Sequence, residues 1–256
     1  MASCKEIYAY LETLLPISLR CAWDNDGIMV CASPHTEVFR VLTAVDITDE
    51  VIEEGIAKDV QLILSHHPLL FHPLKSVTAD DVSAGKVIRL LQAGIAAFSF
   101  HTRLDAAQGG INDLLAQQLG LTQTEPFGLP DAQMGRIGII QPTDFFAFCT
   151  DLKKRLCCSA IQYVAPKATI ARVAVLGGAG KDFLSAASHA NADVFVTGEM
   201  SYDAMLSAAG MGINVIAAGH YETEQVCRTY FAQALARKFP HIRVLQSELH
   251  APVKVF

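Results

Sequence analysis

The sequence predicts an α/β protein built from two similar lobes, each with a mostly parallel sheet, and two observations support this fold class. First, short apolar runs typical of buried strands alternate with amphipathic stretches typical of helices, which is the order of β-α-β units. Second, residues 40–67 align without a gap on residues 172–199, so that strand, helix and strand coincide. We therefore expect a duplicated fold with two intertwined lobes and a functional site between them.

The first lobe is predicted to span residues 1–125. It opens with an amphipathic helix, because Ile7, Leu11 and Leu14 recur at helical spacing, and Pro16 ends this helix. The strands predicted after it are 38–45, 60–64 and 95–100, and the helices are 49–58, 80–93 and 110–119. This alternation predicts parallel strands joined by helical crossovers.

The second lobe is predicted to span residues 126–256. A softer segment rich in Gly, Pro and Gln, residues 122–133, marks the boundary between the lobes. The predicted strands of the second lobe are 136–140, 161–164, 170–176, 194–197, 213–217 and 243–245. Helix-forming stretches lie between these strands, so the α/β order continues toward the end of the chain.

Composition limits the class of partner. The net charge of −6 argues against a protein that tracks nucleic-acid phosphates, which requires clustered Lys and Arg. No apolar run approaches the roughly 18 residues of a membrane span, and the first 20 residues lack the features of a signal peptide. The seven cysteines are scattered and include no C-x-x-C, which favours reduced thiols. We expect a cytoplasmic protein that binds neither membrane nor nucleic acid.

Three short polar segments each follow an apolar run that resembles a buried strand. They are Ser65-His66-His67-Pro68, the His-x-x-x-Asp segment from His101 to Asp105, and the His-x-x-x-Glu segment from His220 to Glu224. The last two follow corresponding strands of the two halves. Because ligands gather beyond the carboxyl ends of parallel strands, segments that are distant in sequence can meet there.

These segments together offer four imidazoles and two carboxylates. Six such side chains exceed what one ion usually takes from a protein and approach what two neighbouring ions need. Mixed nitrogen and oxygen ligands without thiolate point to Zn, Mn, Fe, Co or Ni. A single histidine after a strand is more often a hydrogen-bonding residue than a ligand, but three such segments together favour a metal site.

Several runs resemble the YbgI-like dinuclear metal-centre family, often labelled GTP cyclohydrolase I type 2 homologues. The runs are Ser-His-His-Pro-Leu-Leu-Phe at 65–71, residues 100–115, Val-Thr-Gly-Glu-Met-Ser at 196–201 and Ala-Gly-His-Tyr-Glu-Thr-Glu at 218–224, with Trp23-Asp24-Asn25 and Ala44-Val45-Asp46 as further landmarks. The resemblance implies that the metal-site positions are His66, His67, His101, Asp105, His220 and Glu224.

The same resemblance implies a duplicated α/β fold and a ring-shaped homohexamer whose metal sites face an internal cavity. Longer relatives carry an inserted middle domain, which a chain of 256 residues is too short to hold. Two positions depart from the family pattern: Asp203 stands where a histidine is common, and Cys31 stands where a glycine is common. Asp203 either changes the polarity of the pocket or is a surface helix residue.

A glycine-rich run follows one of the predicted strands, at Gly177-Gly178-Ala179-Gly180-Lys181. It lacks the first glycine and the Ser/Thr of a P-loop, and it lacks the spacing of a dinucleotide fingerprint. We interpret it as a tight turn from a strand to a helix.

Two classes of function fit these features. The first is metal-assisted hydrolysis of a small-molecule substrate, in which Glu199 or Glu222 moves the proton and Asp203 is a further candidate. The family label implies opening of a purine ring, whereas the residues themselves suit phosphate-ester or amide hydrolysis equally well. The second class is a non-catalytic metal carrier or a regulatory interaction protein.

Overall fold

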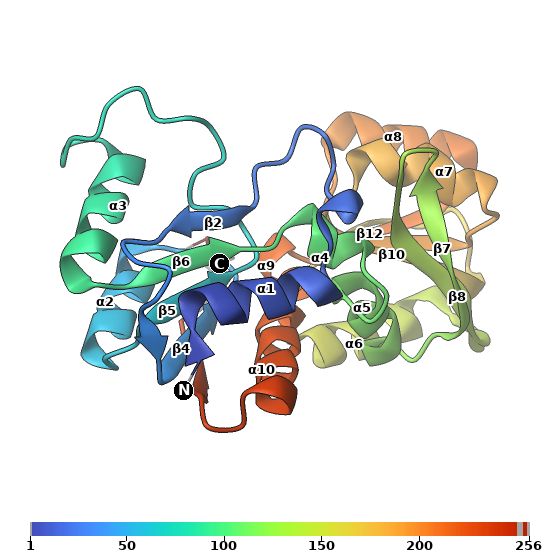
Figure 1. Ribbon diagram of the computed structural model, residues 1–256. Helices are drawn as coiled ribbons and strands as arrows, with labels where there is room; N and C mark the ends of the chain where they lie inside the picture. Colours follow the sequence, from blue (N-terminus) through green and yellow to red (C-terminus); the bar gives the residue numbers. More distant parts are fainter. Residues whose placement is uncertain (1, 250–252, 255–256) are drawn as a thin grey trace. The chain divides into compact units, whose positions relative to one another are not determined.

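The computed structural model describes residues 2–249 and 253–254. They fall into two compact units, one formed by residues 2–107 with 227–249 and the other mainly by residues 108–226. Each unit is built around its own sheet (Figure 1). This division differs from the predicted one because the chain enters the second unit at residue 108, and its last helix and strand return to the first.

The first unit contains a five-stranded sheet in the order β13-β4-β5-β6-β2. Its strands are β13 (Arg243–Gln246), β4 (Arg40–Ala44), β5 (Leu62–Ser65), β6 (Ala96–Ser99) and β2 (Gly27–Val30), and β1 (Ala2–Ser3) pairs separately with β3 (Glu37–Val38). The strands β13, β4, β5 and β6 are parallel, and β2 is antiparallel to β6. The predicted strands 60–64 and 95–100 are confirmed, whereas 38–45 divides into β3 and β4.

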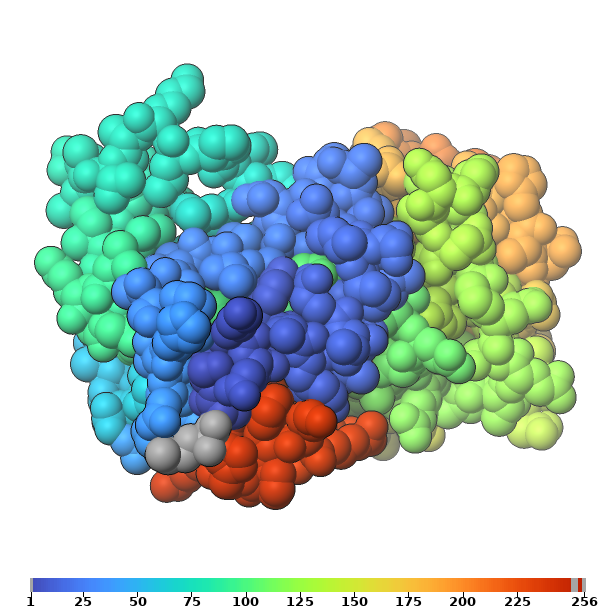
Figure 2. Space-filling model, in the orientation of Figure 1, coloured from blue at the N-terminus to red at the C-terminus, as the bar shows by residue number. Residues whose placement is uncertain are grey.

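The helices of the first unit are α1 (Cys4–Leu14), η1 (Ile17–Leu19), α2 (Asp49–Ala57), α3 (Val82–Ala93), α4 (Thr102–Ala106) and α10 (Val226–Lys238). A capping box of Ser3 and Glu6 begins α1, as its backbone donors require. Between β5 and α3, nearly all side chains from 71 to 81 are exposed. This segment stands out as the teal region at the upper left of Figure 2.

The second unit contains a six-stranded sheet in the order β7-β8-β10-β11-β12-β9. Its strands are β7 (Thr122–Leu129), β8 (Ala132–Asp144), β10 (Thr169–Ala179), β11 (Val194–Glu199), β12 (Asn214–Ala217) and β9 (Gln162–Val164). The strands β10, β11 and β12 are parallel and the others are antiparallel. The soft segment 122–133 is therefore mostly an edge strand, a position that tolerates its Pro126.

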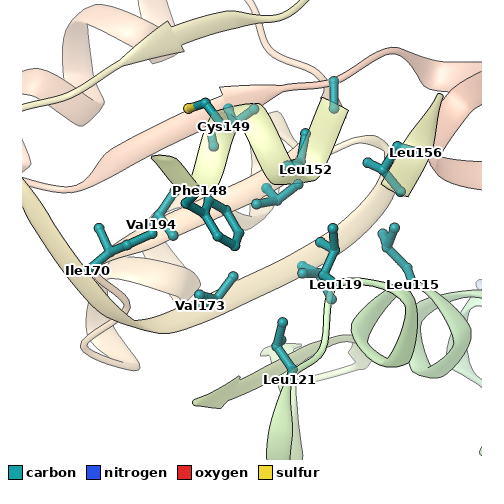
Figure 3. Close-up of a cluster of buried hydrophobic side chains, with 14 of the residues drawn as sticks. Leu115, Leu119, Leu121, Phe148, Cys149, Leu152, Leu156, Ile170, Val173 and Val194 are labelled. Carbon is teal, nitrogen blue, oxygen red and sulfur yellow. The ribbon is translucent and has the colours of Figure 1, made fainter. Parts of the chain in front are cut away.

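The helices of the second unit are α5 (Ile111–Gln118), α6 (Phe145–Leu156), η2 (Lys181–Phe183), α7 (Leu184–His189), α8 (Tyr202–Met211) and α9 (His220–Glu224). Figure 3 shows the core in which α5 and α6 pack on the sheet. Leu115 of α5 and Leu152 of α6 are fully buried there together with Val173 of β10. Burial of each such side chain contributes about 1.5–3 kcal/mol relative to exposure.

Both units repeat one frame, which supports the expected duplication. In the first unit, three parallel strands are followed by a short helix in the order β4-α2-β5-α3-β6-α4, and the second unit repeats this as β10-α7-β11-α8-β12-α9. A short helix that carries candidate ligands thus follows the third strand in each unit.

Among the described residues, none of the helices combines the length and hydrophobicity that crossing a membrane requires.

Candidate metal centre

Three histidines of the first unit come together where β5 and β6 end. His66 and His67 directly follow β5, and their backbone N–H groups donate to the carbonyl of Val45 at 3.1 and 3.0 Å. His101 follows β6 and begins α4. Ring centroids of the three histidines lie 4.9–5.5 Å apart, and one ring nitrogen of each lies within 4.8 Å of the others. Three imidazoles at this spacing can share one ion.

Each of these imidazoles is oriented by a partner on its Nδ1 atom. The Nδ1 atom of His67 is 2.7 Å from Asp46 Oδ1, and that of His101 is 2.9 Å from Asp24 Oδ1. The Nδ1 atom of buried His66 is 3.1 Å from the carbonyl oxygen of Phe100. A neutral imidazole that donates from Nδ1 presents its lone pair on Nε2, which is how most metal-binding histidines are held.

Asp105 adds a carboxylate to the three histidines. It lies on α4, which begins immediately after His101, and the side chain is largely buried. Its Oδ1 atom is 3.6 Å from Nε2 of His66. The first unit therefore brings three imidazoles and one carboxylate together in one place.

Two buried carboxylates anchor His101 and the start of α4. Asp24 accepts hydrogen bonds from the backbone N–H and the hydroxyl of Thr102, at 3.1 and 2.6 Å. Asp26 accepts from the backbone N–H of His101 at 3.1 Å and from Nε of Arg103 at 3.0 Å. The position of His101 is therefore set both through its ring and through its backbone.

Electrostatics keep this anchor ionised. Burial raises the pKa of Asp24, but the hydrogen bonds from His101 and Thr102 outweigh burial and bring the pKa to about 2. Burial alone would lower the pKa of Arg103, but contacts with Asp26 and Glu12 outweigh it and raise the pKa. The guanidinium of Arg103 is fully buried, and its carbon lies 4.7 Å from the centre of the Phe100 ring.

The second unit presents a smaller ligand set at the equivalent strand ends. His220 begins α9, just beyond β12, and its Nε2 atom lies 3.2 Å from Oε2 of Glu224. The Nδ1 atom of His220 lies 3.2 Å from Oε1 of Glu199, the last residue of β11. Glu224 is buried, whereas the side chain of Glu199 is 63% exposed. The i, i+4 spacing places His220 and Glu224 on one helix face, as predicted.

Glycine makes room for the buried carboxylate. Gly178 has a φ of +68°, and a Cβ there would overlap Oε1 of Glu224 and lie 3.2 Å from Nε2 of His220. Thr223 and Thr197 hold Gly178 in place, because the hydroxyl of Thr223 accepts from its N–H at 3.1 Å and that of Thr197 donates to its carbonyl at 3.0 Å. The run 177–181 does pass from a strand to a helix as predicted, but β10 continues to Ala179, so that Gly180 alone separates it from η2.

Glu222 and Asp203, the other proposed proton carriers, also lie in the second unit. Glu222 is half-buried on α9, and its carboxylate lies against Gly219 at the start of that helix. Asp203 lies on α8 with its side chain 71% exposed, and its Oδ2 atom is 3.1 Å from Nζ of Lys181. Hydrogen bonding to Ser201 and Lys181 lowers the pKa of Asp203. These contacts agree with the surface-helix alternative for Asp203.

The cysteines stand apart from these ligand sets. All seven are free thiols in the structure. Burial and the neighbouring Cys31 raise the pKa of Cys4 to about 12. Cys31, where this chain departs from the family pattern, therefore lies beside a buried thiol. None of the cysteines lies in the three ligand segments. The donors are therefore imidazole and carboxylate alone, a set that suits borderline transition metals.

Comparison with known proteins identifies the family. The model of the family described as Duf34/NIF3 (NGG1p interacting factor 3) matches residues 2–252. The chain belongs to this family. A Duf34/NIF3 relative from Clostridium acetobutylicum named "GTP cyclohydrolase 1 type 2 homolog" is 32% identical over 227 residues, which are 86% of this chain and 84% of the relative.

Solved structures of the Duf34/NIF3 fold agree with the chain over nearly its whole length. A Bacillus cereus protein related to NIF3 has a TM-score of 0.92 at 24% identity, covering 100% of this chain and 99% of the other. Protein ybgI, described as of unknown function, has a TM-score of 0.87 at 22% identity, covering 98% and 100%. The expected fold and the resemblance to the YbgI-like family are thus confirmed.

Some residues that shape the candidate centre were not predicted for that role. Asp24 and Asp46 belong to segments that the sequence singled out only as family landmarks, and here they orient His101 and His67. Gly178 belongs to the glycine-rich run that the sequence analysis singled out, but the run was not predicted to make room for Glu224. An acidic residue just before or after a strand could have been sought as a histidine partner, because metal-binding histidines usually need one.

Proposed function

We propose that the protein binds two divalent transition-metal ions and is a metal-dependent hydrolase. The ions would be Zn, Mn, Fe, Co or Ni. The observation that carries this proposal is the triad of His66, His67 and His101, in which every Nδ1 is held by an oxygen and the rings converge. Such outer partners are costly to assemble and are a regular feature of metal sites.

All six predicted residues would serve as metal ligands. His66, His67, His101 and Asp105 would come from the first unit, and His220 and Glu224 from the second. Glu224 would be a ligand, since its buried carboxylate offers two oxygens and lies beside the imidazole of His220.

The chemistry proposed is hydrolysis. A pair of such ions, when bound, supplies a water that is acidic near neutral pH and charge that stabilises the transition state. Glu199 is the preferred proton carrier, because its exposed carboxylate lies 3.2 Å from His220. Glu222 and Asp203 remain the alternatives. The name of the Clostridium relative, "GTP cyclohydrolase 1 type 2 homolog", favours a purine nucleotide as one substrate to test.

A second candidate function is non-catalytic. The family's description, NGG1p interacting factor 3, refers to an interaction rather than a reaction. It supports a metal carrier or a regulatory interaction protein that holds ions without turning over a substrate. A coordinatively closed site would favour this alternative, and a site with an open position would favour the enzyme.

We also propose that the protein is a homohexamer. Several large apolar side chains of the second unit are exposed, including Tyr202 at 79% and Leu206 at 58%, four residues apart on α8. Exposed apolar side chains grouped in this way are typical of an interface between subunits. Sedimentation should give a hexamer, and a stable monomer near 27.7 kDa at micromolar concentration would contradict this proposal.

Free thiols support a reducing compartment, and we propose the cytoplasm. Cys4 and Cys149 are buried, and burial raises the pKa of Cys149 to about 11, so both thiols are poorly reactive. Alkylation under denaturing conditions during cell lysis, which exposes the buried thiols, followed by mass spectrometry should find all seven thiols reduced. A stable disulfide in freshly lysed cells would oppose this assignment.

The decisive experiment is metal analysis joined to an activity panel. Protein purified without chelator, or reconstituted with Zn or Mn, should carry about two ions per chain. Loss of Glu224 should remove more than one ion if it bridges, whereas His35→Ala, at an exposed histidine, should change nothing. Trace metal after reconstitution would falsify the proposal.

The activity panel separates the two candidate functions. It covers nucleotides, cyclic nucleotides, phosphate esters and small amides, with His66→Ala as the control for contaminating activity. Activity that a strong chelator abolishes and added metal restores supports the hydrolase. If metal binds fully and no substrate is turned over, the carrier or regulatory function is favoured instead.

A further inference from the structure

Two large aromatic side chains of the first unit are exposed beside its histidines. Trp23 is 61% exposed and Phe71 is 40% exposed, and their ring centroids are 6.1 Å apart. Both also contact His101: its ring centroid is 6.1 Å from that of Trp23 and 6.3 Å from that of Phe71. The three rings therefore form one cluster that adjoins the candidate metal ligands.

The backbone around Trp23 and Phe71 is held by hydrogen bonds of the residues next to them in sequence. Asp24, next to Trp23, is fixed through its buried carboxylate to α4, as described above. Asn25 donates from Nδ2 to the carbonyl of Leu70, the residue before Phe71. Contacts of adjacent residues thus fix the backbone of Trp23 and Phe71, while their side-chain rings are exposed to solvent. A rigidly placed aromatic side chain loses little entropy when a ligand packs on it.

The geometry of the cluster suits a ligand with a flat ring. The planes of Trp23 and Phe71 are inclined by 49°, and those of Trp23 and His101 by 76°. Rings inclined in this way do not cover one another's faces, so a flat ring could lie on one of them. Single exposed apolar side chains are ordinary, but two in contact with each other and with a candidate ligand form a continuous surface.

We propose that Trp23 and Phe71 form a stacking subsite, which selects ligands that carry a planar aromatic ring next to a metal-binding group. The inference rests on the proposed function, because the ligand's other end is bound by metal at His66, His67 and His101. It goes further by assigning specificity to two residues that bind no metal. Stacking on an aromatic side chain is tolerant of ring chemistry, so ring flatness rather than ring identity is selected.

The test compares two probes that share a metal-binding group and differ only in the ring. Benzohydroxamate and cyclohexanecarbohydroxamate have the same zinc-chelating head, but only the first has a flat ring. Both are titrated into zinc-loaded full-length protein by calorimetry. We expect the aromatic probe to bind about 5- to 100-fold more tightly, the range that stacking of one ring gives. Trp23 is the chain's only tryptophan, so its fluorescence should also change on binding of the aromatic probe.

Two variants locate the effect. Trp23→Leu and Phe71→Leu should each reduce the preference for the flat ring, with zinc content and affinity for the cyclohexane probe unchanged. Both side chains are exposed, so these variants should fold. The matched control is Phe39→Leu: this phenylalanine is 45% exposed and precedes β4, at the end of the sheet opposite to the histidines. It should retain the full preference.

The possible outcomes are distinct for the two proposals. Equal binding of the two probes to zinc-loaded protein, or a preference that survives both variants, overturns the stacking subsite and leaves the metal site standing. Absence of bound zinc overturns both. If either variant changes the oligomeric state but keeps the preference, the rings belong to an interface between copies, and the stacking subsite is again overturned.

Discussion

The two units share one arrangement of strands and helices but carry different candidate ligands at the ends of their strands. In the first unit, the side chains beyond β5 and β6 are three imidazoles and the carboxylate of Asp105. In the second, the residues at the ends of β11 and β12 contribute one imidazole and the carboxylates of Glu199 and Glu224. The frame thus sets where ligand side chains lie, and single residues set the type of donor.

The units also differ in how their ligands are supported. In the first unit, the carboxylates of Asp24 and Asp46 orient histidine rings by hydrogen bonding. In the second unit, glycines leave space for the candidate ligands: Gly178 leaves room for Glu224, and a Cβ at Gly198 would lie 2.8 Å from the Cα atom of His220. A ligand position in the same frame can therefore be defined either by a hydrogen-bond partner or by the absence of a side chain.

The largest effect is expected from removing a candidate ligand that also supports the fold of the first unit. His101→Ala removes an imidazole and leaves the buried carboxylate of Asp24 without the ring that it contacts. We expect loss of about one ion per chain, and a free energy of unfolding lower by about 2–3 kcal/mol in the metal-free protein. Metal analysis and urea unfolding measure the two effects, with exposed His35→Ala as control. Full zinc content in His101→Ala would remove this residue from the ligand set.

The next largest effect should come from filling the space in the second unit. Gly178→Ala adds a Cβ that overlaps the carboxylate of Glu224, at a residue with positive φ. We expect about 2 kcal/mol of destabilisation together with reduced zinc content. The matched control is Gly210→Ala on α8, where the added Cβ meets no atom within 4 Å and stability should not fall. Equal stability of the two variants would mean that the space at Gly178 is not required.

Removing the outer partners should have a moderate effect that compares the units directly. Asp46→Ala removes the oxygen beside Nδ1 of His67, and Glu199→Ala removes the oxygen beside Nδ1 of His220. Each should weaken zinc binding by about 10- to 100-fold, the usual result of losing such a partner. Competition with a chelating dye measures this. If only Asp46→Ala weakens zinc binding, Glu199 does not orient His220, and proton transfer is the role that it keeps.

The smallest expected effect concerns pH and a carboxylate remote from the ligands. Burial raises the pKa of Asp193, but hydrogen bonds from the backbone of Arg172 and Ala171 and from Lys167 outweigh burial and lower the pKa. The unfolded value is about 3.9, so the stability contributed by the ionised group is present above that pH and is lost as pH falls below it.

Urea unfolding between pH 5 and pH 3 tests this sign. Asp193→Asn should flatten the pH dependence of stability by about 1 kcal/mol. The control is Asp131→Asn, at an exposed turn residue between β7 and β8, which should leave the dependence unchanged. A steeper dependence in Asp193→Asn would mean that the pKa of Asp193 is raised, contrary to its hydrogen bonds.

The central strands could be predicted from local sequence because burial on both faces demands a continuous apolar run. The runs at 60–64 and 194–197 became β5 and β11 for this reason. The edge strands were predicted less evenly. The runs at 161–164 and 243–245 became the edge strands β9 and β13. The strand β2 was not expected at all, and β7 was expected to be a soft boundary, because an edge strand is half-exposed and its sequence is often mixed.

By itself, the sequence determined the repeated frame and the side chains that follow its strands, because strand, helix and ligand signals are all local. Only the tertiary structure decided what those side chains contact. β13 completes the sheet of the first unit by pairing with β4, about 200 residues earlier in the chain. Asp24 reaches His101, and Gly178 makes room for Glu224, only after the chain has folded. Such contacts join segments far apart in sequence, and no local pattern of residues encodes them.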